Sequence, residues 1–350
     1  MMSGNTNQKS MTLVAEYHSN SDIRIKEIAR PNINDHEALV KMEACGICGT
    51  DVMEWYRKKT APKVLGHEMS GSIVQLGKKV ENFSLGDRVF VSHHVPCFDC
   101  YYCKNSKHSA CDSLHAGNFY PGGFAEYIKI PEENLNYGTF KLPEKMTYNE
   151  AAMIEPMACA VAGQNMLHLK DNQTILIIGS GISGLCHIIL AKMKGLNVIS
   201  TDISDYRVDQ AKYFGSDYSF HADKISADKF REINRGRLAD VVINCAGNKS
   251  AVENAFKYLD KKGEILFFAI PSSSIELPFA NLWRNEASLF FSYGAATNDI
   301  KTTIDLYNEG KINFEKMITH QIKLSNIIDG FKLVEAAHDS IKVVINPDTN

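Results

Sequence analysis

Four cysteines in one short segment have the spacing of a closed metal site. Cys97, Cys100, Cys103 and Cys111 follow the pattern C-x2-C-x2-C-x7-C. Four thiolates at this spacing can complete a tetrahedral shell around Zn²⁺ with no vacant position, which is typical of a structural zinc. A zinc ribbon that binds nucleic acid is an alternative, but this segment contains no arginine. The spacing therefore predicts a structural zinc lobe at about residues 93–115.

A second set of candidate ligands lies in two shorter runs, Cys45-Gly46-Ile47-Cys48-Gly49-Thr50-Asp51 and Gly66-His67-Glu68. One thiolate, one imidazole and one carboxylate leave a position for water or a substrate oxygen, as a catalytic zinc requires. On spacing alone, the two cysteines could also form a redox pair or half of a closed zinc site. A lone histidine is more often a core residue than a ligand, so these residues alone leave the choice open.

A glycine-rich turn, Gly179-Ser180-Gly181-Ile182-Ser183-Gly184, stands between a predicted strand and a predicted helix. In such a turn the first glycine permits a tight bend, the second lets the backbone approach a pyrophosphate, and the third lets helix and strand pack closely. The helix N-terminus offers N–H groups to the phosphates. Asp202 follows at the distance of a ribose-binding acid. This context predicts a dinucleotide site rather than a plain turn with a solvated aspartate.

The predicted cofactor is NAD(H), because the carboxylate of Asp202 would repel the 2′-phosphate of NADP(H). Arg207 is close enough in sequence to flank the adenosine, but it does not remove that repulsion. The complete predicted cofactor site consists of Gly179, Gly181, Ile182, Ser183, Gly184, Asp202, Arg207, Cys245 and Phe268.

The elements that must position these residues change in kind near residue 156. Before it, short β-type runs broken by glycine indicate a small, irregular barrel. These runs are 38–42, 70–76, 88–92 and 125–130. After it, predicted strands alternate with amphipathic helices, which indicates a doubly wound parallel sheet. The predicted strands are 174–178, 196–201, 240–244 and 264–268, and the predicted helices are 182–194, 208–214 and 251–259. A helix at 299–309, a segment at 318–324, a further helix and a last strand at 341–345 follow.

The bulk composition narrows the class of protein. With 350 residues, 44% hydrophobic and 23% charged, the chain is long enough for two soluble domains. A net charge of −3 gives no reason to expect nucleic acid or a membrane as a partner. The first ten residues are polar, so we expect neither a secretory signal nor an anchor. Nine cysteines without an export signal predict a cytoplasmic protein.

These motifs together resemble the zinc-containing medium-chain dehydrogenase family, and within it the sorbitol (iditol) dehydrogenase-like branch. The resemblance covers residues from about 11 to 346. Besides the runs above, it rests on Gly86-Asp87-Arg88-Val89, Gly122-Gly123-Phe124-Ala125-Glu126-Tyr127 and Glu155-Pro156, which stand in the family's order.

The resemblance assigns roles to individual residues. It makes Cys48 and His67 ligands of a catalytic zinc and Glu68 a ligand or near neighbour. Glu155 takes the place of the third protein ligand, which either binds zinc or holds the zinc-bound water. Asp51 is implied to accept from the far nitrogen of His67. Thr50 is implied to pass the substrate proton towards the nicotinamide ribose. Some relatives end that relay with a histidine, but Val52, Met53 and Glu54 stand there in this chain.

The resemblance also implies the architecture. The expected fold is α/β, with a doubly wound Rossmann domain at 158–293 inserted into a GroES-like β-barrel catalytic domain formed by 1–157 and 294–350. The active site is expected between them. Each chain would hold two Zn²⁺, one catalytic and one structural, and we expect a homodimer or homotetramer.

The expected reaction is reversible oxidation of a secondary alcohol by NAD, in a polyol, cyclitol or sugar-derived substrate. Candidate pocket residues are Trp55, Tyr56, His93, His94, Phe119 and Tyr293, for which a place in the core is an equally good reading. Sorbitol dehydrogenases carry an Arg-Tyr pair where Ser292-Tyr293 stands, so sorbitol itself is in doubt. A threonine dehydrogenase-type oxidation of an amino alcohol is an alternative.

Two further alternatives belong to other classes. One is a zinc- and nucleotide-binding regulatory or structural protein on the same scaffold, and the other is a zinc-free quinone reductase. The complete ligand set, Thr50 and the cysteine lobe argue against both.

Overall fold

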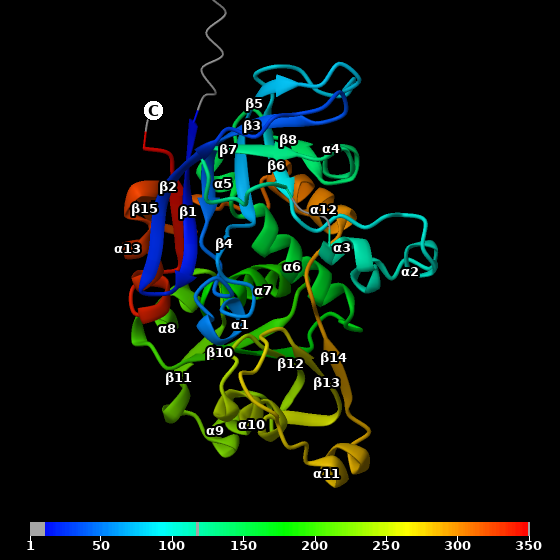
Figure 1. Ribbon diagram of the computed structural model, residues 1–350. Helices are drawn as coiled ribbons and strands as arrows, with labels where there is room; N and C mark the ends of the chain where they lie inside the picture. Colours follow the sequence, from blue (N-terminus) through cyan, green and yellow to red (C-terminus); the bar gives the residue numbers. More distant parts are fainter. Residues whose placement is uncertain (1–10, 117–118, 349–350) are drawn as a thin grey trace, which may run out of the picture. The chain divides into compact units, whose positions relative to one another are not determined.

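The computed structural model describes residues 11–116 and 119–348 (Figure 1). The chain forms two compact units. Unit 1 consists of Met1–Glu155, Phe314–Ala336 and Lys342–Asn350, and unit 2 of Pro156–Asn313 and Ala337–Ile341. Both ends of the chain therefore belong to unit 1, with unit 2 inserted between them.

Unit 1 is a β-rich domain built around β3 (Ala38–Gly46), whose residues are nearly all buried. This strand pairs with three neighbours in one sheet of order β15-β16-β3-β5-β6-β8, to which β7 is added beside β3. The other strands of this sheet are β5 (Glu68–Leu76), β6 (Arg88–Ser92), β7 (Tyr127–Ile130), β8 (Thr139–Lys141), β15 (Ile318–Lys323) and β16 (Lys342–Asn346). A core that includes Val40, Phe124 and Phe331 holds this domain together.

A second, smaller sheet of unit 1 has the order β2-β1-β4. Its strands are β1 (Met11–Ser19), β2 (Asp22–Ala29) and β4 (Lys63–Val64). The helices of this part of the chain are α1 (Glu54–Arg57), α2 (Tyr101–Lys104), α3 (Asp112–Ala116), α4 (Glu132–Tyr137), α5 (Tyr148–Ala151), α13 (Ile327–Ala336) and the 3-10 turns His108–Ala110, Glu315–Met317 and Leu324–Asn326. Helix α6 (Ile154–Asn165) begins at the end of unit 1 and continues into unit 2.

Unit 2 contains one parallel sheet of order β11-β10-β9-β12-β13-β14. With β9 as the first strand, this is the order 3-2-1-4-5-6 of a dinucleotide-binding domain. The strands are β9 (Thr174–Ile178), β10 (Asn197–Asp202), β11 (Tyr218–His221), β12 (Ala239–Asn244), β13 (Leu259–Phe267) and β14 (Ser288–Phe291). The helices are α7 (Ile182–Met193), α8 (Asp205–Tyr213), α9 (Ala227–Ile233), α10 (Lys249–Lys257), α11 (Phe279–Arg284), α12 (Thr297–Asn308) and the 3-10 turn Ala222–Lys224.

The predicted fold class is therefore confirmed, with a correction at the second domain boundary. Unit 2 extends to Asn313, whereas the sequence placed its end at residue 293. The reason is α12, whose buried residues include Ile300 and Thr303 and which is part of unit 2. The short segment Ala337–Ile341 also belongs to unit 2.

Several elements were predicted close to their observed limits, and others, among them β1, β2 and α6, were missed. Strand β9 has the predicted limits because all five of its residues are buried, and β6 matches as well. Strand β2 was not predicted; all of its side chains are partly or fully exposed and several are charged, so no buried face marks it. Among the residues that the structure describes, no helix has the length and apolar character needed to cross a bilayer.

Candidate active site

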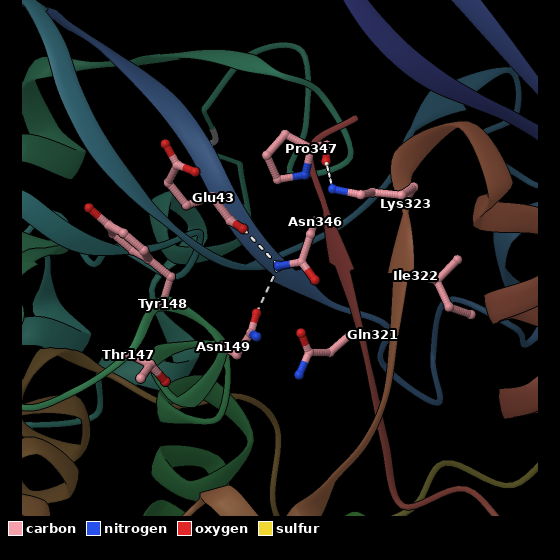
Figure 2. Close-up of a pocket in the computed structure, with 9 residues that line it drawn as sticks. All are labelled: Glu43, Thr147, Tyr148, Asn149, Gln321, Ile322, Lys323, Asn346 and Pro347. Carbon is pink, nitrogen blue, oxygen red and sulfur yellow. Dashed lines mark hydrogen bonds between the residues drawn. The ribbon is translucent and has the colours of Figure 1, made fainter. Parts of the chain in front are cut away.

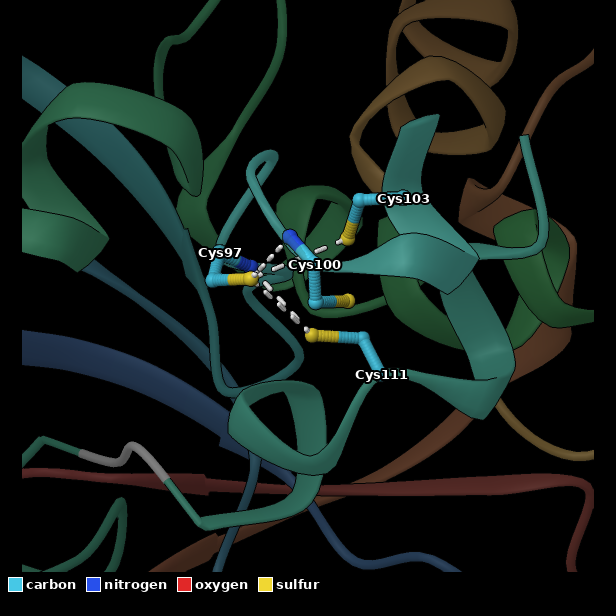
Figure 3. Close-up of side chains that lie close together, drawn as sticks. All are labelled: Cys97, Cys100, Cys103 and Cys111. Atoms are coloured by element: carbon cyan, nitrogen blue, oxygen red, sulfur yellow. Dashed lines mark hydrogen bonds between the residues drawn. The ribbon is translucent and has the colours of Figure 1, made fainter. Parts of the chain in front are cut away.

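The four cysteines of the predicted structural site come together in the lobe around α2 (Figure 3). The sulfur of Cys97 lies 3.6 Å from that of Cys111 and 4.0 Å from that of Cys103. Four sulfurs at about 2.3 Å from a tetrahedral zinc would lie roughly 3.8 Å apart, so the observed separations fit the ion. Backbone N–H groups of Cys97 and Cys100 donate to Cys111 and Cys97 sulfurs respectively. These donors stabilise thiolates, which are the form that binds metal.

The open set of ligands lies where several strands of unit 1 reach the same edge of their sheet. Gly46 at the end of β3 pairs with Glu68 at the start of β5, and Glu68 pairs with Ser92 at the end of β6. Because β3 and β5 are antiparallel, as are β5 and β6, the residues that follow β3, precede β5 and follow β6 meet at this edge. Cys48 follows β3, His67 precedes β5, and His93 follows β6.

Cys48, His67 and Glu68 form one candidate metal group, with their ligand atoms within 4.8 Å of one another. Thiolate, imidazole and carboxylate are all zinc ligands, and three protein ligands with a free position are typical of a catalytic zinc. Glu155, His93 and His94 form a second group of the same compactness. The rings of His67 and His93, 4.7 Å apart between centroids, join the two groups. The donor chemistry therefore fits a zinc ion, as the resemblance implied.

Glu68 has a partner that the sequence did not predict. Lys342, the first residue of β16, places its ammonium nitrogen 2.6 and 2.8 Å from the two carboxylate oxygens of Glu68. Both side chains are 1% exposed. A Cβ on Gly46 would lie 1.9 Å from Glu68 Oε2, so only glycine leaves room for this carboxylate. Each oxygen of Glu68 keeps a second lone pair beside its bond to Lys342, so Glu68 and Glu155 are both candidates for the third ligand or its near neighbour.

His67 is embedded among anions. Its side chain is 13% exposed, and its Nδ1 lies 3.6 Å from the buried Asp51 Oδ1. Burial by itself would lower the pKa of His67, but Asp51 and then Cys48 outweigh this effect and raise the pKa to about 10. The 3.6 Å separation is longer than a hydrogen bond. The carboxylate of Asp51 instead accepts the backbone N–H of Cys48 at 3.1 Å, which positions the thiol.

Thr50 lies in the turn between β3 and α1. Its hydroxyl donates to the sulfur of Cys48 at 3.3 Å and accepts from Arg57 Nη2 at 2.8 Å. Arg57 also donates to Asp51. Neither Arg57 nor Lys342 was singled out in the sequence. A lysine inside the apolar run from 341 to 345 was the one available signal for Lys342.

Four of the six candidate pocket residues differ clearly in their surroundings. His94 is buried beside Glu155, in keeping with a place near the metal ligands. Phe119 is 3% exposed and packs in the core of unit 1, which is the core reading that the sequence left open. Trp55 is 40% exposed, and Tyr293, in unit 2, is 58% exposed.

The glycine turn of unit 2 has the geometry that its sequence predicts. Gly179 has a φ of +89°, which favours glycine, and a Cβ on Gly184 would lie 1.9 Å from the carbonyl oxygen of Gly179. Gly181 is the N-cap of α7, so Ile182 and Ser183 form the first turn of that helix. The guanidinium of Arg207 lies above Gly181, 3.6 Å from where its Cβ would be. These groups surround the place for a pyrophosphate.

Asp202 ends β10 beside this turn and is 6% exposed. Its two oxygens accept the backbone N–H groups of Ser180 at 2.7 Å and Ser204 at 2.9 Å. Each carboxylate oxygen has a second lone pair, so Asp202 can still accept a ribose hydroxyl. Cys245 and Phe268 follow β12 and β13, and their backbone N–H groups bond to Ile178 and Asn244. Both therefore lie at the carboxyl edge of the parallel sheet, where nucleotides bind.

A surface pocket elsewhere in unit 1 has a volume of about 420 Å³ (Figure 2). The amide of Asn346 lies at its centre and donates to the carbonyl oxygen of Glu43 and to Asn149. It contains none of the predicted site residues; its walls are Glu43, Thr147, Tyr148, Asn149, Gln321, Ile322, Lys323, Asn346 and Pro347. Its described residues also contain no group of candidate metal ligands, so we assign the chemistry to the Cys48 region instead.

Comparison with known proteins agrees with both units. Residues 34–144 match the family model described as alcohol dehydrogenase GroES-like domain, and residues 183–309 match the one described as zinc-binding dehydrogenase. A sorbitol dehydrogenase of Halalkalibacterium halodurans is 30% identical over 345 residues, which cover 96% of this chain and 98% of the relative.

Two solved structures also align over nearly the whole chain. A putative zinc-binding dehydrogenase of Sinorhizobium meliloti, bound to NADP, is 26% identical with a TM-score of 0.86 and covers 97% of this chain and 100% of its own. An alcohol dehydrogenase of Escherichia coli complexed with NADH is 28% identical with a TM-score of 0.85 and covers 96% and 99%. On the sequence match to the sorbitol dehydrogenase and on both family models, the chain belongs to the family of zinc-dependent medium-chain alcohol and polyol dehydrogenases.

Proposed function

We propose that this protein is a zinc-dependent, NAD(H)-linked dehydrogenase that reversibly oxidises a secondary alcohol of a polyol, cyclitol or sugar-derived substrate to the ketone. The observation that carries this proposal is the open ligand group of Cys48 and His67 with a nearby carboxylate and the Thr50 hydroxyl. A closed four-cysteine lobe stands apart from it as a structural site.

Different residues of this chain would bind the metal, orient its ligands and face the substrate. When bound, zinc polarises the alcohol oxygen and NAD accepts the hydride. Cys48 and His67 would hold the metal. Glu155, whose charge acts on His67, would be the third ligand or the holder of a water. Asp51 orients the Cys48 backbone, and its buried carboxylate beside His67 favours a bound cation. Thr50, bonded to the sulfur of Cys48, holds its hydroxyl at the place where a substrate proton leaves.

We propose NAD(H) as the preferred cofactor. Asp202 is buried at the end of β10 and keeps lone pairs for ribose hydroxyls, while a 2′-phosphate against it would meet like-charge repulsion. The solved relatives are bound to NADP in one case and NADH in the other, so the family uses both. The choice in this chain therefore rests on Asp202.

A screen of alcohol substrates tests the function. The purified protein is incubated with NAD and, separately, with polyols, cyclitols, sugar alcohols and L-threonine, and NADH absorbance is followed. We expect turnover with a vicinal diol of the polyol or cyclitol class and none in a His67→Asn variant, which lacks a metal ligand. Turnover confined to L-threonine would favour the amino alcohol alternative, and no turnover with any substrate would contradict the proposal.

We also propose that the protein is a homo-oligomer with unit 2 at its interface. Strand β14 ends the parallel sheet, and in the described residues it pairs only with β13. Large apolar side chains beside this edge are exposed, with Phe291 at 66%, Trp283 at 72% and Phe279 at 74%. A second β14 related by a two-fold axis would cover this edge and its apolar surroundings.

Light scattering after size-exclusion chromatography tests this assembly. The unmodified protein is expected to run as a dimer or tetramer, and a Trp283→Asp variant as a smaller species. An unmodified protein of monomer mass, or a variant with unchanged mass, would contradict the proposed interface.

A further inference from the structure

The side chain of Arg57 binds the Thr50 segment at several points. Its Nε donates to the backbone carbonyl oxygen of Thr50 at 2.9 Å, and its Nη2 donates to the Thr50 hydroxyl oxygen at 2.8 Å. The same Nη2 lies 3.2 Å from Asp51 Oδ1. The side chain of Arg57 is 19% exposed and that of Asp51 is fully buried. One guanidinium thus holds both residues that follow the ligand Cys48 and its neighbour Gly49.

The segment between Thr50 and Arg57 is held by a network from the first hairpin of unit 1. The Tyr17 hydroxyl donates to Asn20 Oδ1 at 2.8 Å, and the Asn20 amide donates to the carbonyl oxygen of Val52 at 2.8 Å. The backbone N–H of Asn20 donates to Glu54 at the start of α1. These bonds anchor both the Thr50 turn and helix α1, which carries Arg57. The hydrogen bond from Arg57 Nη2 to the Thr50 hydroxyl therefore joins two fixed segments.

The chemistry of arginine determines what this contact does. A guanidinium has only N–H donors and stays protonated in proteins, so it cannot take a proton from Thr50. The Thr50 oxygen is the acceptor in this bond, and its single O–H must therefore point elsewhere. In the structure it points to the sulfur of Cys48.

We propose that Arg57 is the positioning residue of the Thr50 hydroxyl. It occupies one lone pair of that oxygen and directs the O–H towards the Cys48 sulfur, so that the second lone pair is left to accept the hydroxyl of the substrate. This inference rests on the proposed function.

Kinetics of a double-mutant cycle tests the inference. Arg57→Met is expected to lower kcat by about 10- to 100-fold, as loss of a charged hydrogen bond does, with KM changed little. Thr50→Val is expected to lower kcat by about 100-fold or more. In the Thr50→Val background, Arg57→Met should have almost no further effect, because Arg57 acts through the hydroxyl. Arg57→Lys, which retains one donor, should recover part of the lost kcat.

Lys58→Met is the matched control, because this neighbouring cation on α1 is 57% exposed and pairs with Glu54 rather than with Thr50. It should keep the parent kcat. An Arg57→Met enzyme with the kcat of the parent would overturn the proposal. So would a double variant whose fold-loss in kcat equals the product of the losses in Arg57→Met and Thr50→Val. So would an Arg57→Lys enzyme that is no better than Arg57→Met.

A spectroscopic readout separates this inference from the proposed function. In the cobalt-substituted protein, loss of a hydrogen bond to the Cys48 sulfur should move its sulfur-to-cobalt charge-transfer band to longer wavelength. Thr50→Val and Arg57→Met should shift the band in the same direction, and Lys58→Met should leave it unchanged. Cobalt bound by the four cysteines absorbs equally in parent and variant, so its band cancels when one spectrum is subtracted from the other. An unshifted band in Arg57→Met would contradict the inference even if no alcohol is oxidised. If the parent lacks turnover but the band shifts, the proposed function alone fails.

Discussion

Two buried imidazoles, one in each unit, have pKa values displaced in opposite directions. His187 on α7 of unit 2 is completely buried, and burial, followed by the nearby charge of Lys194, lowers its pKa to about 3. Its ring meets the edge of Phe268 and the amide of Gln164. His67 of unit 1 is also largely buried, yet Asp51 and Cys48 raise its pKa to about 10. Burial is common to both sites, so the difference comes from the anions around them.

The comparison shows which region of the molecule is built to hold positive charge. Around His67, the structure collects Cys48, Asp51, Glu68 and Glu155, and it supplies Lys342 beside them. Among the described residues, the pKa of His187 is shifted by burial and by Lys194 and not by an anion, so its surroundings favour a neutral ring. A metal cation fits the first region and not the second, because its charge replaces that of a protonated imidazole.

The largest effect on stability should come from replacing Lys342, the buried cation near His67. Lys342→Met leaves the buried carboxylate of Glu68 without its partner, and breaking a buried pair in this way typically costs about 3–5 kcal/mol. The free energy of unfolding by urea at pH 7 measures this loss. A double variant, Glu68→Leu with Lys342→Met, should recover much of it because no buried charge remains.

The control is Lys332→Met, an exposed lysine of α13 that is expected to stay within about 0.5 kcal/mol of the parent. A Lys342→Met protein as stable as this control would show that the pair is not needed to balance Glu68.

The second effect is the pH dependence of stability that the neutral imidazole of His187 causes. Because the folded pKa of His187 is lowered to about 3, the unfolded chain takes up the proton first as the pH falls below about 6.5. The parent should therefore lose roughly 3 kcal/mol more stability than a His187→Leu variant between pH 6.5 and pH 4, and nothing extra above pH 7.

Urea unfolding at a series of pH values gives both curves. His168→Leu, at a histidine of unit 2 with a 78% exposed side chain, serves as control and should keep the slope of the parent. Parallel curves for the parent and His187→Leu would mean that His187 takes up its proton in the folded state.

The smallest effect concerns the one carboxylate of unit 2 to which we assign a ligand. Asp202 should make NAD better than NADP by more than about tenfold in kcat/KM, since like-charge repulsion costs at least this much. Asp202→Ser should weaken the use of NAD and relieve the penalty on NADP. Initial rates with both cofactors measure it, and equal efficiency in the unmodified enzyme would contradict the assignment.

The sites differ in how much of them the sequence could reveal. The cysteine lobe and the glycine turn are contiguous, so their spacing predicts them before any fold is known. The Cys48 region draws on strands far apart in the chain, and Lys342 meets Glu68 across 274 residues. Pairing over such distances is set by sheet topology, which residue types do not encode locally. The resemblance supplied the ligands but not Arg57 or Lys342, because neither belongs to its motifs.

Zinc content measured beside turnover tests the central claim most directly, that Cys48 belongs to the catalytic metal and the four-cysteine lobe to a structural one. The unmodified protein should hold about two zinc ions per chain. The Cys48→Ser variant should hold about one zinc ion per chain and lose turnover while remaining folded. The Cys100→Ala variant should lose zinc and stability, while the activity of each folded chain changes less. Full activity with a single zinc in the unmodified protein, or a Cys100→Ala variant that melts like the parent but has no turnover, would contradict this assignment.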